Sequence, residues 1–264
     1  MKGRRKIVCF LTDFSQDVYV AQMKAVILSI YPYVNFIELS TKITPQNVLE
    51  ASFILYHTYH YFPAGTLFVN VVDPGVGTKR KIIFAQVSDY YFLAPDNGLL
   101  YPLIENKINV KLIEVKNSKF FLKRTSNTFH GRDIFSPVAA YFLKGIEMQR
   151  FGPPLKKIKS LDIFAIKKGA NFIEGKVCFI DNFGNIITNI KEEIFNSFIG
   201  NKSFKAILKN KIINYFSSAY QFAPSGKPFL IIGSFYTVEI SLKNDSAQKF
   251  FKANVGDSVK ICRI

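Results

Sequence analysis

Tryptophan is missing from this sequence of 264 residues, and cysteine, histidine and methionine occur only three times each. Cys9, Cys178 and Cys262 stand singly in apolar segments, which indicates neither a disulfide framework nor a zinc site. No apolar run approaches the roughly 20 residues of a membrane-spanning helix. The basic start, residues 1–6, precedes too short an apolar stretch for a signal peptide. We therefore expect a cytoplasmic protein with no part in a membrane.

Acidic residues are scarce relative to basic ones, 19 against 35, which gives a net charge of +16. Such a charge could attract nucleic acid. However, the sequence contains no zinc-finger spacing, helix-turn-helix signature or aromatic RNA-recognition motif. The chain is rich in lysine, isoleucine, asparagine and phenylalanine together. This indicates a composition bias across the whole chain and not one basic binding face. We expect no nucleic-acid partner.

The first half of the chain alternates apolar strand-like runs with stretches of helical period, which is typical of an α/β domain with a mostly parallel sheet. Strands are expected at 6–12, 34–39, 66–72, 82–87 and 90–94. Helices are expected at 20–30, 45–61 and 133–143, with a short one after the turn at 95–98. Pro45 suits the first turn of its helix.

The second half reads differently, with short strands, frequent turns and one convincing helix around 245–251. This texture predicts a small β-barrel domain. The Gly-, Pro- and Lys-rich stretch 151–159 is the best candidate for a connection. We divide the chain into an N-terminal α/β domain at 1–160, a linker at 161–170 and a C-terminal β-barrel domain at 171–264.

Polar side chains follow two of the predicted strands, where open α/β sheets bind ligands. Asp13 leaves the first strand and could accept hydrogen bonds from a sugar diol, although a helix cap would explain it too. The loop Asp73-Pro-Gly-Val-Gly leads to Arg80, and its glycines allow close approach to a ligand. The alternative interpretation of this sequence is a tight hairpin with a surface arginine.

His130 stands at the mouth of a predicted helix, next to Gly131, which leaves room for a ligand. A buried structural histidine is the alternative. His57 and His60 form an i, i+3 pair, but no carboxylate or cysteine joins them at ligand spacing. We treat these two as structural and expect no metal site.

A fourth segment, residues 180–189, opens the predicted β domain. Phe183 is flanked by a carboxylate and two amides, so it could stack on a purine whose edge Asn185 reads. A glycine-containing hairpin turn explains these letters almost as well.

Together these segments resemble the S-adenosylmethionine (SAM) hydroxide adenosyltransferases, a family related to the fluorinating and chlorinating SAM enzymes. The resemblance spans nearly the whole chain and rests on Leu11-Thr12-Asp13-Phe14, the Asp73-Pro-Gly-Val-Gly loop with Arg80, Ala94-Pro95-Asp96-Asn97-Gly98, Phe129-His130-Gly131-Arg132-Asp133, Phe183-Gly184-Asn185 and Gly233-Ser234-Phe235 with Glu239. Two departures are Tyr236, where the family usually has glycine, and the segment 244–247.

The resemblance implies hydrolysis of SAM to adenosine and methionine without any cofactor, SAM being the substrate. It assigns water activation to Asp73, Arg80 and His130. It assigns substrate binding to a second group, in which Asp13 and Asp73 meet the ribose and methionine parts and Phe183 stacks on adenine; the other members are Asn185, Ser234, Phe235 and Glu239. It also implies a homotrimer with each site between neighbouring subunits.

This chemistry suits the residues. The sulfonium leaves as a neutral thioether and needs no acid, so the step that requires catalysis is the activation of the water nucleophile. Arg80 would favour hydroxide character, His130 could accept the proton and Asp73 could orient the pair. Two other functions remain open. One is a halide-using SAM enzyme, against which the residues Asp73, Arg80 and His130 argue. The other is a sensor that binds SAM or adenosine without turnover.

Overall fold

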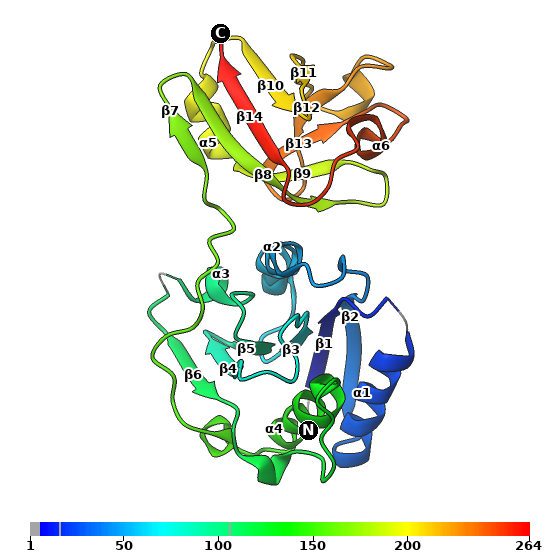
Figure 1. Ribbon diagram of the computed structural model, residues 1–264, viewed down its shortest axis with the longest axis vertical. Helices are drawn as coiled ribbons and strands as arrows, with labels where there is room; N and C mark the ends of the chain where they lie inside the picture. Colours follow the sequence, from blue (N-terminus) through cyan, green and yellow to red (C-terminus); the bar gives the residue numbers. More distant parts are fainter. Residues whose placement is uncertain (1–5, 16, 106) are drawn as a thin grey trace. The chain divides into compact units, whose positions relative to one another are not determined.

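The computed structural model describes residues 6–15, 17–105 and 107–264 of the chain. The chain divides into two compact units, of which the first ends at Leu161 and the second begins at Asp162 (Figure 1). Within the described ranges, no helix is both long and apolar enough to cross a membrane.

The first unit is built on a six-stranded sheet with the strand order β2-β1-β3-β5-β4-β6. The four strands β2, β1, β3 and β5 run parallel, whereas β4 runs antiparallel to both of its neighbours. The predicted α/β fold with a mostly parallel sheet is thereby confirmed. The strand bounds are β1 Lys6–Thr12, β2 Val34–Ser40, β3 Leu67–Val71, β4 Ile82–Val87, β5 Tyr90–Pro95 and β6 Val110–Glu114.

Helices cover this sheet because alternate strand residues are apolar on both faces. On one face, Phe10 and Val69 are fully buried in a core that includes Met23 and Val138 from two helices that pack together. On the other face, Phe68 and Phe92 stack at 5.1 Å between ring centroids. The helices are α1 Asp17–Ile30, α2 Val48–Thr58, α3 Tyr101–Ile104 and α4 Ser136–Leu143.

Helix α2 begins three residues later than the sequence pattern predicts. Gln46 has a positive φ of 65°, which no helix continues, and Asn47 is the N-cap, accepting a hydrogen bond from the Glu50 backbone N–H at 3.0 Å. Pro45 therefore lies in the turn before the helix and not in its first turn.

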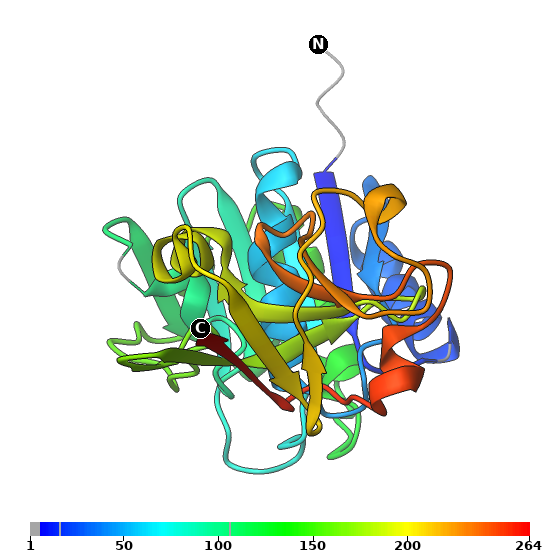
Figure 2. The same ribbon diagram turned by 90° about the horizontal axis from the view of Figure 1, so that it is seen from above.

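The second unit is a nearly closed antiparallel β-barrel, as predicted. Its strand order is β11-β10-β14-β8-β9-β13-β12, with β7 paired to β8. Figure 2 shows β14, in red, beside β10, with which it pairs. Val177, Leu230 and Val259 are fully buried in its core. The strands are β7 Lys167–Gly169, β8 Phe172–Ile180, β9 Ile186–Lys191, β10 Phe204–Leu208, β11 Lys211–Ile213, β12 Phe229–Ile232, β13 Thr237–Ser241 and β14 Ser258–Arg263.

Two α-helices accompany the barrel, where the sequence predicted one. Helix α6, Ala247–Phe251, matches the prediction and is capped by the Ser246 hydroxyl, which accepts from the Lys249 backbone N–H. Helix α5, Glu192–Ile199, was missed. It has only eight residues, and Phe195 and Ile199 are the two that it buries, so its apolar stripe is too short to stand out.

Candidate active site

Two predicted carboxylates leave neighbouring strands at the same edge of the first sheet. Strands β1 and β3 are parallel, and Thr12 pairs with Val71. Asp13 and Asp73 therefore follow the ends of adjacent strands, as the sequence analysis required. Asp13 Oδ2 accepts a hydrogen bond from the Gln46 backbone N–H at 2.7 Å, which joins this edge to the turn before α2.

Asp73 and Arg80 form a buried ion pair across the loop after β3. The Arg80 Nε atom lies 3.0 and 2.8 Å from the two Asp73 carboxylate oxygens, and Nη2 lies 2.5 Å from Oδ2. The two side chains are only 11% and 5% exposed, so water screens the pair little. The alternative of a surface arginine on a hairpin does not hold, because this guanidinium is aimed back at Asp73.

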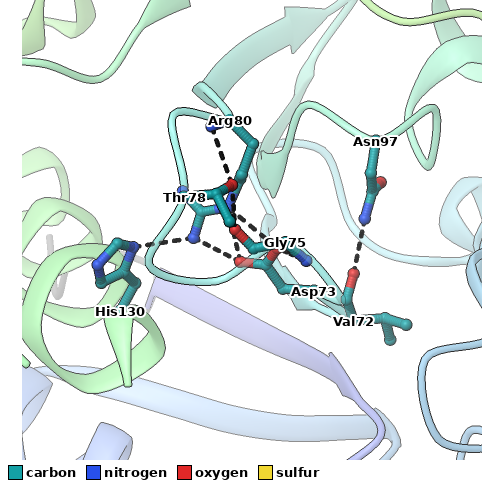
Figure 3. Close-up of polar contacts among 7 residues, drawn as sticks. All are labelled: Val72, Asp73, Gly75, Thr78, Arg80, Asn97 and His130. Carbon is teal, nitrogen blue, oxygen red and sulfur yellow. Dashed lines mark hydrogen bonds and ion pairs between the residues drawn. The ribbon is translucent and has the colours of Figure 1, made fainter. Parts of the chain in front are cut away.

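The loop from Asp73 to Arg80 is fixed from two sides. Gly77 has a φ of +76°, and a Cβ there would come within 2.3 Å of the Asn127 carbonyl oxygen. Asn97 donates from its side-chain amide to the Val72 carbonyl at 2.8 Å, immediately before Asp73 (Figure 3). Gly77 and Asn97, which belong to two different sequence motifs, thus hold the loop that carries the ion pair.

His130 completes the cluster from a distant part of the chain. Its Nδ1 lies 2.9 Å from Arg80 Nη2, and Figure 3 shows the imidazole, the guanidinium and the Asp73 carboxylate in one row. The π-helical turn Gly131–Phe135 follows it, and such turns are frequent at functional sites. A Cβ on Gly131 would lie 3.2 Å from Met23 and 3.4 Å from Val71, so glycine lets this turn approach the end of β3.

The contact with Arg80 defines the state of the His130 ring. A guanidinium can only donate, so Nδ1 is the acceptor and the neutral ring carries its proton on Nε2. Burial lowers the pKa of His130 and the neighbouring Arg80 charge lowers it further, whereas Asp73 and Asp133 oppose this shift. His130 is therefore neutral near pH 7 and offers an Nε2–H donor next to the ion pair.

In the second unit, Phe183 and Asn185 meet at a pocket of about 630 Å³. Phe183 is 80% exposed, so its ring is free to stack on a ligand. Its lining includes Asp181, Phe183, Asn185, Tyr220 and Ser246. We refer to it as the barrel pocket.

Asp181 builds the loop that forms one wall of the barrel pocket. Its Oδ1 accepts from the backbone N–H groups of Phe183 and Asn185, each at 2.9 Å, and its Oδ2 accepts from the Asn185 amide at 2.9 Å. Gly184 has a φ of +84°, and a Cβ there would overlap Ser246. The shape of the Phe-Gly-Asn motif therefore depends on the preceding Asp181 and on Gly184.

Ser234 and Phe235 lie in the turn between β12 and β13, and the barrel pocket is lined by other residues. Tyr236 in the same turn has a φ of +56°, a left-handed conformation that glycine adopts more readily than tyrosine. Glu239 lies on β13 and is 4% exposed, and its Oε1 accepts from the Tyr220 hydroxyl at 2.6 Å. The sequence analysis missed Tyr220, because a lone tyrosine among turn residues gives no pattern.

The histidines predicted to be structural lie away from this chemistry. His57 packs on Phe53 and Tyr56, with ring centroids 4.4 and 5.2 Å apart, and His60 packs on Tyr61. Among the residues that the structure describes, no three His, Cys, Asp or Glu side chains gather as metal ligands would.

Comparison with known families matches both units. The N-terminal domain model of the SAM hydroxide adenosyltransferases matches residues 8–152, and the C-terminal domain model matches residues 175–260. A protein of Thermus thermophilus named (R)-S-adenosyl-L-methionine hydrolase is 30% identical over 96% of this chain and 98% of its own length. A protein of the same name from Methanocaldococcus jannaschii is 33% identical over 97% and 95%.

More distant and structural relatives agree with this match. A fluorinase of an Actinoplanes species is 25% identical, covering 79% of this chain and 80% of its own. The crystal structure of an uncharacterized conserved protein from Thermotoga maritima superposes with a TM-score of 0.87 at 33% identity, covering 97% of this chain and all of that one.

Proposed function

Because this chain belongs to the SAM hydroxide adenosyltransferase family, we propose that it hydrolyses SAM to adenosine and methionine. The observation that carries the proposal is the convergence of Asp73, Arg80 and His130 in one hydrogen-bonded row, although 50 residues separate Arg80 from His130. The names of the two hydrolase relatives support the same reaction.

The proposed reaction is an in-line displacement at the ribose C5′ carbon. The water oxygen forms a bond to C5′ while the C5′–S bond breaks, and sulfur keeps the electron pair, so methionine leaves as a neutral thioether. The water loses a proton to a base or to solvent. Holding water in line with the C5′–S bond can contribute up to ~7–11 kcal/mol in the best-oriented models.

In this proposal the three residues divide the work. Arg80 places its positive charge where hydroxide character develops, and Asp73 holds Arg80 in that orientation. His130 positions the water oxygen through Nε2–H while Arg80 occupies Nδ1. The role of proton acceptor predicted for His130 requires Arg80 to release Nδ1, since the neutral ring has one lone pair.

Substrate binding is proposed for the residues predicted from the sequence. Asp13 would accept hydrogen bonds from the ribose, and the barrel pocket, with Phe183 and Asn185, would take the adenosyl part. Ser234 and Phe235 are proposed to meet the methionine part. Catalytic sites shared between neighbouring copies of a homotrimer remain a proposal, which the solution mass of the 30.1 kDa chain tests.

Incubation of the purified protein with SAM tests the function directly. Chromatography of the products in buffers with and without chloride and fluoride separates three outcomes. Adenosine and methionine in equal amounts support hydrolysis. A 5′-halo-adenosine would replace the proposal by halogenation, and SAM that is bound but recovered intact would replace it by a sensor. Because both relatives are named for the (R) epimer, the assay uses each sulfonium epimer separately, and we propose the (R) epimer as the preferred substrate.

A further inference from the structure

Asp133 is a buried carboxylate shortly after His130 in the chain, and the proposed mechanism assigns it no task. Its side chain is 0% exposed. Its Oδ1 accepts a hydrogen bond from Arg132 Nε at 2.6 Å, and its Oδ2 accepts one from Arg132 Nη2 at 3.2 Å and one from the Ser126 backbone N–H at 2.7 Å. A buried ion pair is often no more stabilising than apolar residues of similar volume, so stability alone does not explain this carboxylate.

Arg132, the ion-pair partner of Asp133, ties the turn after His130 to helix α1. Its Nη1 donates to the side-chain oxygen of Gln22 on α1 at 3.0 Å. Its guanidinium also lies over the Phe129 ring, 5.2 Å from the ring centroid. Because the fork of donors is rigid and has contacts on several sides, it holds the Asp133 carboxylate in one place.

Segment 122–128 ties Asp133 to the loop that carries Arg80. The backbone carbonyl of Asp133 accepts from the N–H at the start of this segment at 3.0 Å, and its carboxylate accepts from an N–H farther along. The Asn127 carbonyl oxygen, in the same segment, lies against Gly77, where an added Cβ would come within 2.3 Å. Asp133 therefore connects the two parts of the chain whose contact places Arg80 beside the imidazole.

Charged groups act on His130 from two elements. Asp73 and Arg80 face it from the loop after β3, and Asp133 lies on the turn that follows it, where Arg132 is directed to Asp133. Burial and then the Arg80 charge lower the pKa of His130, whereas Asp73 and Asp133 raise it. Loss of the Asp133 charge should therefore lower this pKa further.

We propose that Asp133 is a positioning residue for the row of Asp73, Arg80 and His130. Through segment 122–128 it fixes the His130 turn and the Arg80 loop against each other, so that the imidazole Nδ1 stays on the guanidinium and Nε2–H keeps its direction. Asp133 itself contacts neither the substrate nor the attacking water. The inference rests on the proposed function for the reaction that the row performs.

The variant D133N tests the charge. Its amide has one acceptor oxygen and turns a donor toward Arg132 or Ser126, which are donors themselves. We expect kcat to fall about tenfold or more and KM to stay within about twofold, because a small displacement of the row affects the attack on C5′ more than binding. T66V is the matched control: it removes a buried hydroxyl's hydrogen bond, to the Pro63 carbonyl, at the opposite end of β3.

The variant S126P tests the link, and it keeps the inference testable if D133N does not fold. Proline removes the N–H that Asp133 accepts, in a segment outside helices and strands, and leaves the carboxylate and Arg132 in place. S126A keeps that N–H and loses only the hydroxyl, which contacts Thr128. We expect S126P to lose several times more kcat than S126A. Unfolding curves confirm that each variant is folded.

NMR of protein with ¹⁵N-labelled imidazoles gives a readout that needs no turnover. The chain has three histidines, and the spectrum of H130A identifies the signal of His130. In the wild type we expect the tautomer with its proton on Nε2. In D133N we expect His130 to titrate at lower pH and its tautomers to mix, as the contact with Arg80 loosens.

Wild-type kcat in D133N would overturn the inference, and so would equal kcat values in S126P and S126A. A lower kcat in D133N with the titration and tautomer of His130 unchanged would show a merely structural role and would also overturn it. If the His130 signal responds as expected in a protein that does not hydrolyse SAM, the positioning role stands and only the proposed function fails.

Discussion

Arg80 is the side chain on which the catalytic row depends, since one guanidinium contacts both Asp73 and His130. Removing it leaves the Asp73 carboxylate, 5% exposed, without its counter-charge, and losing one partner of a buried pair costs about 3–5 kcal/mol. Lysine keeps the charge but not the fork of donors that reaches two partners. A loss of activity in R80K would therefore show that the arrangement of the arginine donors is required, and not only the positive charge.

We expect R80K and H130A to lower kcat by about 10²-fold or more, the range typical of lost acid, base or electrostatic groups. Binding of adenosine should change far less, because the row acts on water. The matched controls are R150A and H60A, which alter an exposed arginine and an exposed histidine elsewhere in the same unit. Steady-state kinetics with full activity in R80K and H130A would remove both residues from the mechanism.

The protonation state of His130 sets the acidic side of the pH profile. Its pKa lies below the ordinary value of 6.5, because burial and Arg80 disfavour the imidazolium. Protonation would break the hydrogen bond from Arg80, so kcat/KM should fall only as the pH drops below 6.5. The same shift means that the histidine's contribution to stability is lost as the pH falls through this range. An acidic limb centred above 6.5 would contradict this assignment.

Individual site residues could be predicted from the sequence where they belong to a motif. The segments that carry Asp73, Arg80 and His130 stood out because glycines and carboxylates surround these residues, and the family resemblance then assigned the three a joint role. The Arg80 hydrogen bond to Nδ1 could not be predicted, because it depends on the fold bringing the third strand and the turn after His130 together. Tyr220 lacked any signal, since its place at the barrel pocket depends on the fold, which brings its hydroxyl to Glu239 on β13.

At the scale of elements, the loop from Asp73 to Arg80 places the ion pair of the candidate active site at the end of strand β3. We expect G77A to cost about 2 kcal/mol or more of stability and most of the activity, because it combines a left-handed φ with overlap on the Asn127 carbonyl. G65A is the control, with a similar φ of +86° and open space around it, and should cost about 1 kcal/mol. Chemical unfolding and activity assays give both values; equal losses in the two variants would refute the role of packing.

Strands were predicted more reliably than helices. Mostly apolar runs such as the one at β3, where Asn70 is the one polar residue, indicate a buried strand directly. The start of α2 was misplaced, because Asp13, 33 residues away, holds Gln46 in a non-helical turn. Strand β6 and helix α5 were not predicted, since each is short and takes its stability from packing on its unit.

For the whole molecule, the net charge of +16 opposes the approach of a cationic substrate. Raising the salt from about 0.01 to 0.15 M shortens the Debye length from ~30 to ~8 Å, so distant lysines are screened while nearby carboxylates still act. We expect kcat/KM for SAM to rise modestly over this range, with little change in the binding of neutral adenosine. Stopped-assay kinetics at several salt concentrations measure this, and a flat or falling response would contradict it.

The central claim is that water attacks the ribose carbon, and isotope labelling tests it most directly. In water enriched in ¹⁸O, the account predicts that adenosine formed from SAM carries one heavy oxygen at its 5′ position and that methionine carries none. Mass spectrometry of both products, with fragmentation to locate the label, provides the answer. Adenosine without ¹⁸O, or no adenosine at all, would contradict the account.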